Sequence, residues 1–438
     1  MWPYHPDLLN KAVPRYTSFP TAVEFHDGVG ADALGQAIAH VNQQTSLYLH
    51  IPYCDQICWY CGCNTGAANK AHRLASYLDA LDAEVDLVAA RLPKGTPIGR
   101  IAFGGGSPNA IAPLAFVRLL DRVLTAFGAV SPEISVEIDP RGLTGEWVRV
   151  LGRAGVTHVS MGVQTLSDAI QARIGRVQPQ QMIAEAITNL RRSGVGSINF
   201  DLMYGLPGQT WRELGETLDA TIAMAPERIA LFGYAHVPHL LPRQRQIDAS
   251  ALPDQAARFE MAALGYERLT AAGYVPVGFD HFALPHDGLA RAARDGSLRR
   301  NFQGFTDDKS DVLLGMGASA ISNFPDLIIQ NEKNSGRYRM CVSGGRLAGE
   351  RGVWRSKDDR MRAKIIEDIL CHRPTDLSVM MDDPSLVRGL APFLAHGLAR
   401  LEGSILSPTV QTRPYARAIA VLFDSYRSLH KSQFSSAI

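Results

Sequence analysis

Four of the six cysteines of this 438-residue chain stand within one ten-residue stretch. They follow the apolar run 47–51 at C-x3-C-x2-C-x-C spacing and are Cys54, Cys58, Cys61 and Cys63. Thiolates this close repel one another unless a cation or an iron–sulfur cluster takes up their charge. Free buried cysteines and a structural zinc site are the alternatives, although zinc sites more often use two C-x2-C pairs set apart along the chain. Three thiolate ligands and one open iron fit a [4Fe–4S] cluster that accepts a further ligand.

The elements that must position this loop follow a repeating pattern of short apolar runs and longer periodic stretches. We predict strands over 47–51, 98–103, 134–138, 158–163, 198–203 and 229–234. The intervening helices include 75–90, 114–127, 182–192 and 211–223. This alternation implies a parallel sheet with right-handed crossovers. The expected fold class is therefore α/β, a partial TIM-like barrel of six strand–helix units with function at the C-terminal strand ends.

Polar or glycine-rich residues do follow the predicted strands. In chain order the strand ends lead into Gly104-Gly-Gly-Ser-Pro-Asn109, Glu137 with Asp139, Gln164, Asp201, and Phe232 to Ala235. A glycine loop brings backbone amides close to a carboxylate ligand, but it also serves an ordinary tight turn. Asp201 stands among apolar neighbours, where an unpaired charge is costly, so a ribose diol would be a suitable partner. Asp139, before a proline, could be a turn former alone.

The C-x3-C-x2-C loop after a strand resembles the radical S-adenosylmethionine (SAM) superfamily. In that superfamily SAM binds the open iron, and the reduced cluster splits it to give a 5′-deoxyadenosyl radical. The added Cys63, with Tyr48-x-His50 before it, resembles the oxygen-independent coproporphyrinogen III oxidase family. The N-terminal segment Pro14-Arg-Tyr-Thr-Ser-Phe-Pro-Thr-Ala22 and the glycine loop carry the same resemblance, with Ser107 where the family more often has Thr. It extends over nearly the whole chain.

The resemblance implies a [4Fe–4S] cluster on Cys54, Cys58 and Cys61, and two molecules of SAM. The residues it implies at the SAM sites are Tyr48, Tyr60, Gly105, Gly106, Ser107, Glu137, Gln164, Arg176, Asp201, Phe232, Ala235 and Ile321. Tyr48 and Cys63 are also expected in catalysis, although the chemical role of Cys63 is undefined. Without the resemblance, Gln164 reads equally as a satisfied barrel-mouth amide and Arg176 as a solvated helix residue.

The implied reaction is oxidative decarboxylation of two propionates of coproporphyrinogen III to vinyl groups, giving protoporphyrinogen IX. It needs a reducing electron donor and an electron acceptor, neither of which the sequence identifies. A flat tetrapyrrole with four propionates needs apolar walls and several cations. The substrate candidates are Arg15, Arg299, Arg300 and Gln303, with Arg243 and Arg245 next; each could instead be a solvated polar residue.

The predicted organisation is an N-terminal arm over 1–45, the barrel with its extension over 46–340, and a C-terminal helical domain over 355–438. A glycine- and arginine-rich linker is expected over 342–352, and a final helix over 415–430 after a short hairpin. Where the family usually has Gly-Arg and then Arg-Asn, this chain has Thr412-Arg-Pro-Tyr-Ala-Arg-Ala418. That departure leaves any C-terminal contact with substrate open.

The bulk composition narrows the class of protein further. A net charge of +1 gives no argument for a nucleic-acid or membrane partner, and no apolar run is long enough to span a bilayer. Clustered cysteines and an N-terminus unlike a signal peptide favour the cytoplasm, and we expect a monomer. The rivals are a haem chaperone on the same scaffold, which would lack Cys63 and the 14–22 segment, and a radical SAM enzyme acting on another tetrapyrrole.

Overall fold

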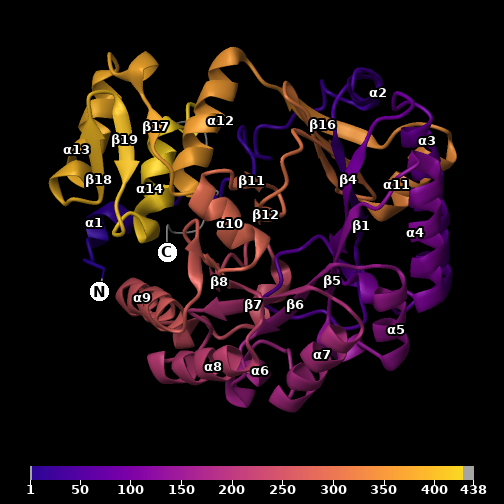
Figure 1. Cartoon of the computed structure of the whole chain (residues 1–438), viewed down its shortest axis with the longest axis horizontal. Helices are drawn as coiled ribbons and strands as arrows, with labels where there is room; N and C mark the ends of the chain where they lie inside the picture. Colours follow the sequence, from indigo (N-terminus) through magenta and orange to yellow (C-terminus); the bar gives the residue numbers. More distant parts are fainter. Residues whose placement is uncertain (1, 428–438) are drawn as a thin grey trace.

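A computed structural model describes residues 2–427. Its centre is a sheet in which six neighbouring strands run parallel (Figure 1). These strands are β1 (Thr45–Ile51), β4 (Ile98–Gly105), β5 (Glu133–Ile138), β6 (His158–Gln164), β7 (Ser197–Tyr204) and β8 (Arg228–Gly233). All six predicted strands are confirmed, with ends that differ by at most two residues.

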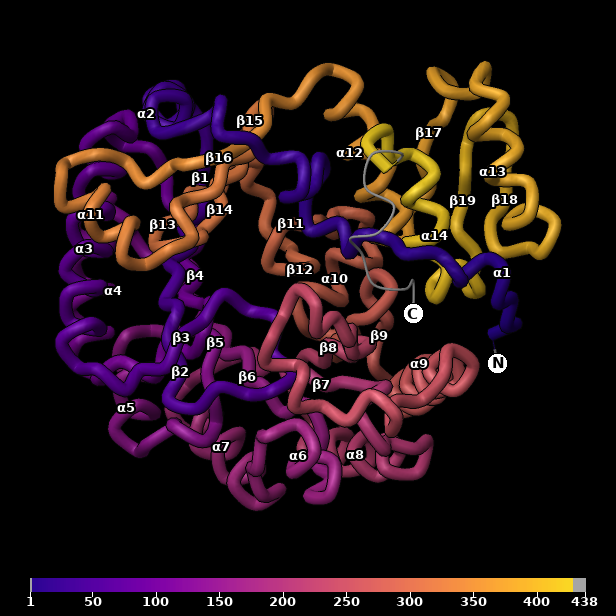
Figure 2. Tube along the Cα trace, turned by 180° about the vertical axis from the view of Figure 1, so that it is seen from behind, coloured from indigo at the N-terminus to yellow at the C-terminus, as the bar shows by residue number. Residues whose placement is uncertain are grey.

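Helices follow these strands and cover the outer face of the sheet (Figures 1 and 2). They are α3 (Ala71–Ala89), α4 (Pro113–Phe127), α5 (Gly145–Arg153), α6 (Asp168–Arg173), α7 (Gln180–Arg192) and α8 (Trp211–Met224), with α9 (Gln255–Ala271) after β8. The helices α5 and α6 were not predicted, because nine and six residues are too few to show a clear helical period.

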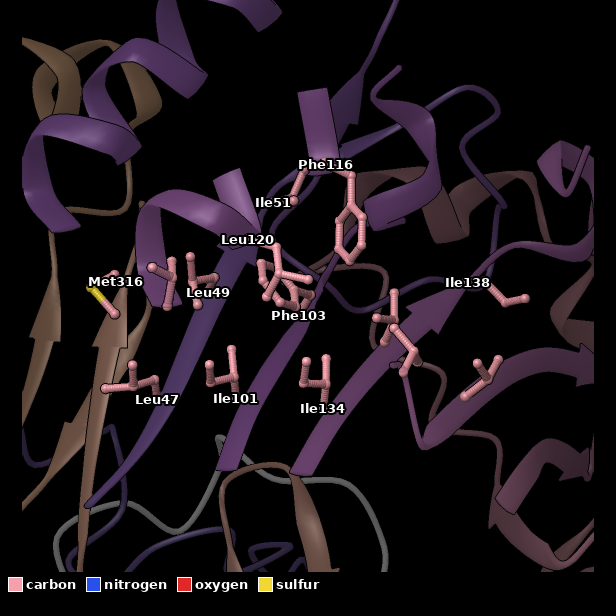
Figure 3. Close-up of a cluster of buried hydrophobic side chains, with 14 of the residues drawn as sticks. Leu47, Leu49, Ile51, Ile101, Phe103, Phe116, Leu120, Ile134, Ile138 and Met316 are labelled. Atoms are coloured by element: carbon pink, nitrogen blue, oxygen red, sulfur yellow. The ribbon is translucent and has the colours of Figure 1, made fainter. Parts of the chain in front are cut away.

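The core lies between the sheet and these helices, and strand alternation decides which side chains enter it. Leu47 and Leu49 of β1 lie opposite Ile101 and Phe103 of β4, and these side chains point toward Phe116 and Leu120 of α4 (Figure 3). Successive strand residues point to opposite faces. The residues between them, such as Tyr48 and His50, therefore face the interior of the barrel.

The sheet does not close, so the barrel is partial. One edge continues from β1 into β13 (Val312–Met316), β14 (Ile321–Asn323), β15 (Leu327–Asn331) and β16 (Gly349–Trp354), with α11 (Ser335–Ser343) before β16. The other edge ends in β10 (His281–Ala283) and β9 (Val275–Val277). Among the described strands, β13 and β8 are not neighbours in the sheet order. The fold prediction is confirmed as a mostly parallel, partial barrel.

The predicted linker over 342–352 is wrong, because its second half is strand β16 at the sheet edge. Its glycines suggested a loop, but Gly349 and Gly352 serve close packing instead. A Cβ atom on Gly352 would stand 2.5 Å from the Ile328 carbonyl oxygen on the paired strand. Such an approach is possible only without a side chain, so glycine here marks a contact between strands.

The C-terminal region forms a separate hydrophobic cluster, which also buries the beginning of the chain. It contains α12 (Lys357–Leu370), β17 (Thr375–Asp376), α13 (Pro384–Ala395), β18 (Ala399–Glu402), β19 (Ile405–Pro408) and α14 (Ala416–Ala420). Leu9 of α1 (Pro6–Leu9), Val13, Tyr16 and Phe19 belong to this cluster. Figure 2 shows the N-terminal segment lying along this region.

The predicted final helix over 415–430 is wrong in its extent. Helix α14 ends at Ala420 and a short 3-10 turn, Val421–Phe423, follows it. Phe423 is fully buried, and Asp424 accepts a 2.8 Å hydrogen bond from the Tyr16 hydroxyl, so contacts with the arm override the helical period. Residues 428–430 of that prediction lie outside the described residues.

Smaller elements connect these regions. They are α2 (Ala31–Ala39), β2 (Tyr53–Cys54), β3 (Gly66–Ala67), α10 (Gly288–Asp295), β11 (Arg299–Asn301) and β12 (Gly304–Thr306). Helix α2 lies within the predicted extended arm, yet Leu34 and Ile38 enter the main core. Within residues 2–427, none of the helices combines the length and apolar character needed to cross a bilayer.

Candidate active site

The C-terminal ends of the parallel strands surround a cavity of about 490 Å³, here called the cysteine cavity. Its lining includes Cys54, Cys58, Cys61 and Cys63. The loop that carries them is anchored at both ends. Strand β2, which ends at Cys54, pairs with β3 beyond the loop, and the Trp59 amide donates to the Ile174 carbonyl at 3.1 Å. These contacts hold the thiols at the barrel mouth.

Two buried arginines face the Cys58 thiol. The Arg176 Nη1 and Arg141 Nη2 atoms lie 3.2 and 3.3 Å from Cys58 Sγ. Both guanidinium groups also pair with Asp139, at 3.3 and 2.6 Å. Burial raises the pKa of Asp139, but Arg141 and Arg176 outweigh it, so that this pKa is lowered overall. Fixed positive charge beside a thiol stabilises its ionised form, which is the form that binds iron.

The four thiols have different environments. The Cys63 amide donates to Cys61 Sγ at 3.4 Å. A hydrogen bond from the Cys63 thiol, supported by this amide and by Arg243 and Arg176, lowers the pKa of Cys61 to about 6. Burial raises the pKa of Cys54 to about 11. The spacing in the sequence gives no reason to distinguish the chemical environments of the four cysteines. In the structure, Cys63 donates a hydrogen bond to Cys61.

The donor set fits an iron–sulfur cluster. Within residues 2–427, no three His, Cys, Asp or Glu side chains are close enough to share a single metal ion. A four-iron cluster poses a different requirement, because each thiolate binds its own iron. Cys54, Cys58 and Cys61 line one cavity, with Arg141 and Arg176 to offset their negative charge.

The glycine loop after β4 holds the Glu137 carboxylate. The Gly105 amide donates to Glu137 Oε2 at 3.1 Å. A Cβ atom on Gly104 would lie 2.7 Å from that carboxylate, and Gly105 has φ +117° beside the His50 ring, so glycine is required at both positions. Glu137 is half-buried at the cavity wall, and its removal from water raises its pKa to about 7. A ligand ammonium would supply the missing positive partner.

Asp201 is a second half-buried carboxylate on the wall of this cavity. It accepts hydrogen bonds from Ser160 Oγ at 3.0 Å and Asn199 Nδ2 at 2.9 Å. Burial raises its pKa, and these donors partly offset the effect. Gln164, at the end of β6, has φ +65°, which is uncommon for a residue with a side chain and recurs at functional sites.

Most of the predicted SAM residues line the cysteine cavity. Besides those above, they are Tyr60, Gly106, Ser107, Phe232 and Ala235. Tyr48 and Ile321 do not line it. Tyr48 is buried beside it, with its hydroxyl 3.0 Å from His50 Nδ1. Ile321 lies in β14 and lines a cavity on the other side of the sheet edge.

Of the four predicted substrate residues, Arg15, Arg300 and Gln303 line one further cavity and Arg299 does not. Arg15 also lines the cysteine cavity, and its Nη2 donates to the Gly233 carbonyl at 2.9 Å. Arg299 instead forms ion pairs with Asp311 at 2.9 Å and Glu367 at 3.4 Å.

Two residues of the site were not predicted. Arg141 stands just after β5, so the rule that function follows strand ends could have found it. Gln244 donates to the carbonyls of Tyr60 and Ala235 at 3.0 and 3.1 Å. It lies in a short 3-10 segment far from any strand end, and no sequence signal marks it.

Known proteins share both the sequence and the fold. The radical SAM superfamily model matches residues 48–221. An oxygen-independent coproporphyrinogen III oxidase from Bradyrhizobium diazoefficiens is 39% identical over 97% of each chain. One from Escherichia coli is 35% identical over 98% of this chain and 96% of that protein. The solved structure of an E. coli coproporphyrinogen III oxidase, a radical SAM enzyme, covers 97% of this chain and 99% of its own, with a TM-score of 0.90 and 33% identity.

Proposed function

Because this chain belongs to the oxygen-independent coproporphyrinogen III oxidase family of radical SAM enzymes, we propose that it decarboxylates two propionates of coproporphyrinogen III oxidatively, giving protoporphyrinogen IX. One observation carries the proposal. The cysteine cavity gathers the three cysteines, the glycine loop, Glu137 and Asp201 at one barrel mouth. The cysteines suit a cluster, Glu137 suits an ammonium and Asp201 suits a ribose, and a radical SAM enzyme must hold these three parts together.

Cys54, Cys58 and Cys61 would hold the [4Fe–4S] cluster, with Arg141 and Arg176 balancing charge at Cys58. When bound and reduced, the cluster and SAM supply the 5′-deoxyadenosyl radical that removes a hydrogen atom from a propionate β-carbon. The protein contributes orientation, electrostatics and exclusion of water. No general base is needed, because carbon dioxide and one electron leave the substrate.

Glu137 and Asp201 are the proposed anchors of SAM. The Gly105 amide occupies one oxygen of Glu137 and orients the carboxylate toward an ammonium group. Ser160 and Asn199 orient Asp201 so that it can accept hydrogen bonds from ribose hydroxyls. Gly106 and Ser107, whose amides already donate to the carbonyls of Ile51 and Tyr53, complete the wall of this proposed site together with the remaining cavity residues.

We propose a second SAM molecule beside Gln164 and Arg176, with Phe232 and Ala235 lining the SAM pockets and Tyr48 and Ile321 as further SAM contacts. The support is that the first four line the cysteine cavity together with Glu137, in a volume of about 490 Å³. The catalytic roles of Tyr48 and Cys63 remain part of this proposal.

The finer biological setting is also proposed. We infer a cytoplasmic monomer, organised as arm, barrel and C-terminal domain, that uses a reducing electron donor and a separate acceptor. Its support is the presence of six free cysteines in the described part of the chain, since free thiols persist in reducing compartments.

The decisive experiment is anaerobic reconstitution with iron and sulfide, followed by assay with coproporphyrinogen III, SAM and a reductant. We expect a [4Fe–4S] spectrum, release of carbon dioxide and formation of protoporphyrinogen IX. A cluster without these products would disprove the substrate. Tight haem binding without turnover would favour the chaperone function instead.

A further inference from the structure

A second cavity of about 420 Å³ lies next to the cysteine cavity, between the barrel and the C-terminal region. We call it the arginine chamber, because Arg15, Arg300, Arg413 and Arg417 line it. Two further residues besides Arg15, namely Cys63 and Phe232, line both cavities. A ligand that is too large for one cavity could therefore extend across this boundary into the other.

The chamber carries an excess of positive charge. Asp280 is the one acidic side chain among the described residues that line it, and the His281 ring already lies 2.6 Å from its carboxylate. Burial, together with Arg15 and Arg300 nearby, lowers the pKa of Arg417 to about 10. Burial also lowers the pKa of Arg300, even though Asp280 opposes that shift. Three of these arginines are half-buried and Arg15 is exposed, and cations in such excess favour anionic ligands.

Neutral groups hold the guanidinium groups of Arg300 and Arg413 in place. Arg300 Nε donates to the Tyr16 carbonyl at 3.1 Å, and its guanidinium carbon lies 4.5 Å from the centre of the Phe305 ring. Arg413 Nη1 donates to the Gly278 carbonyl. Carbonyls and rings orient a cation without neutralising it, and Arg300 Nη1 and Arg413 Nε have no hydrogen-bond partner. An anionic ligand would supply the missing acceptors.

The walls suit a flat apolar body. Phe279, Phe282 and Phe302 line the chamber together with Trp2 from the N-terminal arm. Strand pair β11–β12, which carries Arg300, lies between the barrel and the C-terminal region (Figure 1). Cations around an aromatic space match a macrocycle that carries carboxylates at its rim.

We propose that the arginine chamber binds the propionates that do not react, with Arg413 and Arg417 as specificity-determining residues from the C-terminal region. This inference rests on the proposed function. The reacting propionate would then cross the Cys63–Phe232 boundary into the cysteine cavity. Because only two of the four propionates react, the substrate has to be held by carboxylates that stay intact. The C-terminal region thus selects substrate, although its family pattern is altered around these arginines.

The test measures binding of coproporphyrin III, the stable oxidised form, to the cluster-loaded protein without SAM, by quenching of porphyrin fluorescence. Arg417→Gln should weaken binding about tenfold, the loss of one charge-assisted hydrogen bond, while leaving iron content and far-ultraviolet circular dichroism unchanged. The uncharged tetramethyl ester should bind the wild type and Arg417→Gln equally.

Two further variants keep the test decisive if Arg417→Gln does not fold. Arg15 is exposed, so Arg15→Gln should fold and should also weaken coproporphyrin III binding. Arg388 is exposed on α13 and outside the chamber, so Arg388→Gln should bind like the wild type. If the folded variants Arg417→Gln and Arg15→Gln bind coproporphyrin III with wild-type affinity, the proposed role of the arginine chamber is wrong. Absence of coproporphyrin III binding by a wild type that turns over coproporphyrinogen III would also overturn the chamber, whereas absence of that turnover would overturn the proposed function instead.

Discussion

The cysteine cavity and the arginine chamber are adjacent, but the chain builds them in different ways. The cavity takes its thiols from one short loop and its carboxylates from the ends of β5 and β7. The chamber takes Arg15 from near one end of the chain, Arg300 from its middle and Arg417 from near the other end. The first region balances negative groups with Arg141 and Arg176, whereas the second keeps its positive charge in excess. In our proposals, the cysteine cavity holds the cofactors and the arginine chamber selects an anionic substrate, and this difference in charge balance fits the two roles.

The largest expected effect is loss of the cluster, which should follow from a change in the cysteine cavity and not from one in the arginine chamber. Cys58→Ser should abolish the cluster and all turnover, because one of three iron ligands is lost. Iron and acid-labile sulfide analysis after reconstitution measures this loss. Cys341→Ser, which changes a cysteine outside the cavity, should keep full iron content, as should Arg417→Gln. Normal iron content in Cys58→Ser would refute the ligand assignment.

Replacement of Arg176 tests whether the positive charge beside Cys58 also stabilises the fold. Arg176→Gln leaves Asp139 and Cys58 with one less buried cation, so the free energy of unfolding should fall by about 3 kcal/mol. Anaerobic urea denaturation measures this change. Arg212 forms an exposed pair with Glu216, so Arg212→Gln should cost less than about 0.5 kcal/mol. Equal losses in the free energy of unfolding for the two variants would show that the burial of Arg176 does not increase its contribution to stability.

Cys63 lies on the boundary and should affect turnover more than assembly. Cys63→Ser should retain the cluster, because Cys63 donates to Cys61 and is not one of the proposed ligands. We expect turnover to fall at least about tenfold, or about 1.4 kcal/mol in the barrier. Product formation and iron content must be measured on the same preparation. Loss of iron would contradict the three-ligand assignment.

The smallest effect concerns pH. Burial raises the pKa of Glu137 to about 7, so this carboxyl becomes protonated as pH falls through neutrality and loses its attraction for an ammonium group. SAM affinity should therefore fall about tenfold from pH 8 to pH 6, as the ionised fraction does. Calorimetric titration of the cluster-loaded protein measures it.

The control for this prediction is Glu137→Gln, which should bind SAM weakly and lack this component of the pH dependence. Over the same pH range, the affinity of the arginine chamber for coproporphyrin III should change little. The pKa of Arg417 is about 10, so its guanidinium group stays charged at both pH values. A wild-type SAM affinity that is flat with pH would show that Glu137 does not face the ammonium.

Particular elements show how far the sequence could be read. The six parallel strands and the cysteine loop were predicted closely, because short apolar runs and ligand spacing are local properties. Strand β16 and the end of α14 were not, because contacts with β15 and with Tyr16 override local composition. Arg141 was within reach of the strand-end rule, while Gln244 was not, since its partners Tyr60 and Ala235 meet it only in the folded chain.

The sequence by itself determined the cluster loop, the order of the strands and the family, because each is carried by residues close together in the chain. Tertiary structure alone decided that Cys63 donates to Cys61, that Glu137 accepts a hydrogen bond from Gly105, and that Arg15 and Arg417 meet across one chamber. The physical reason is that burial, charge balance and hydrogen-bond partners depend on distances in space. Those distances are set only when the strands pair and the segments that carry Arg15 and Arg417 fold against the open barrel.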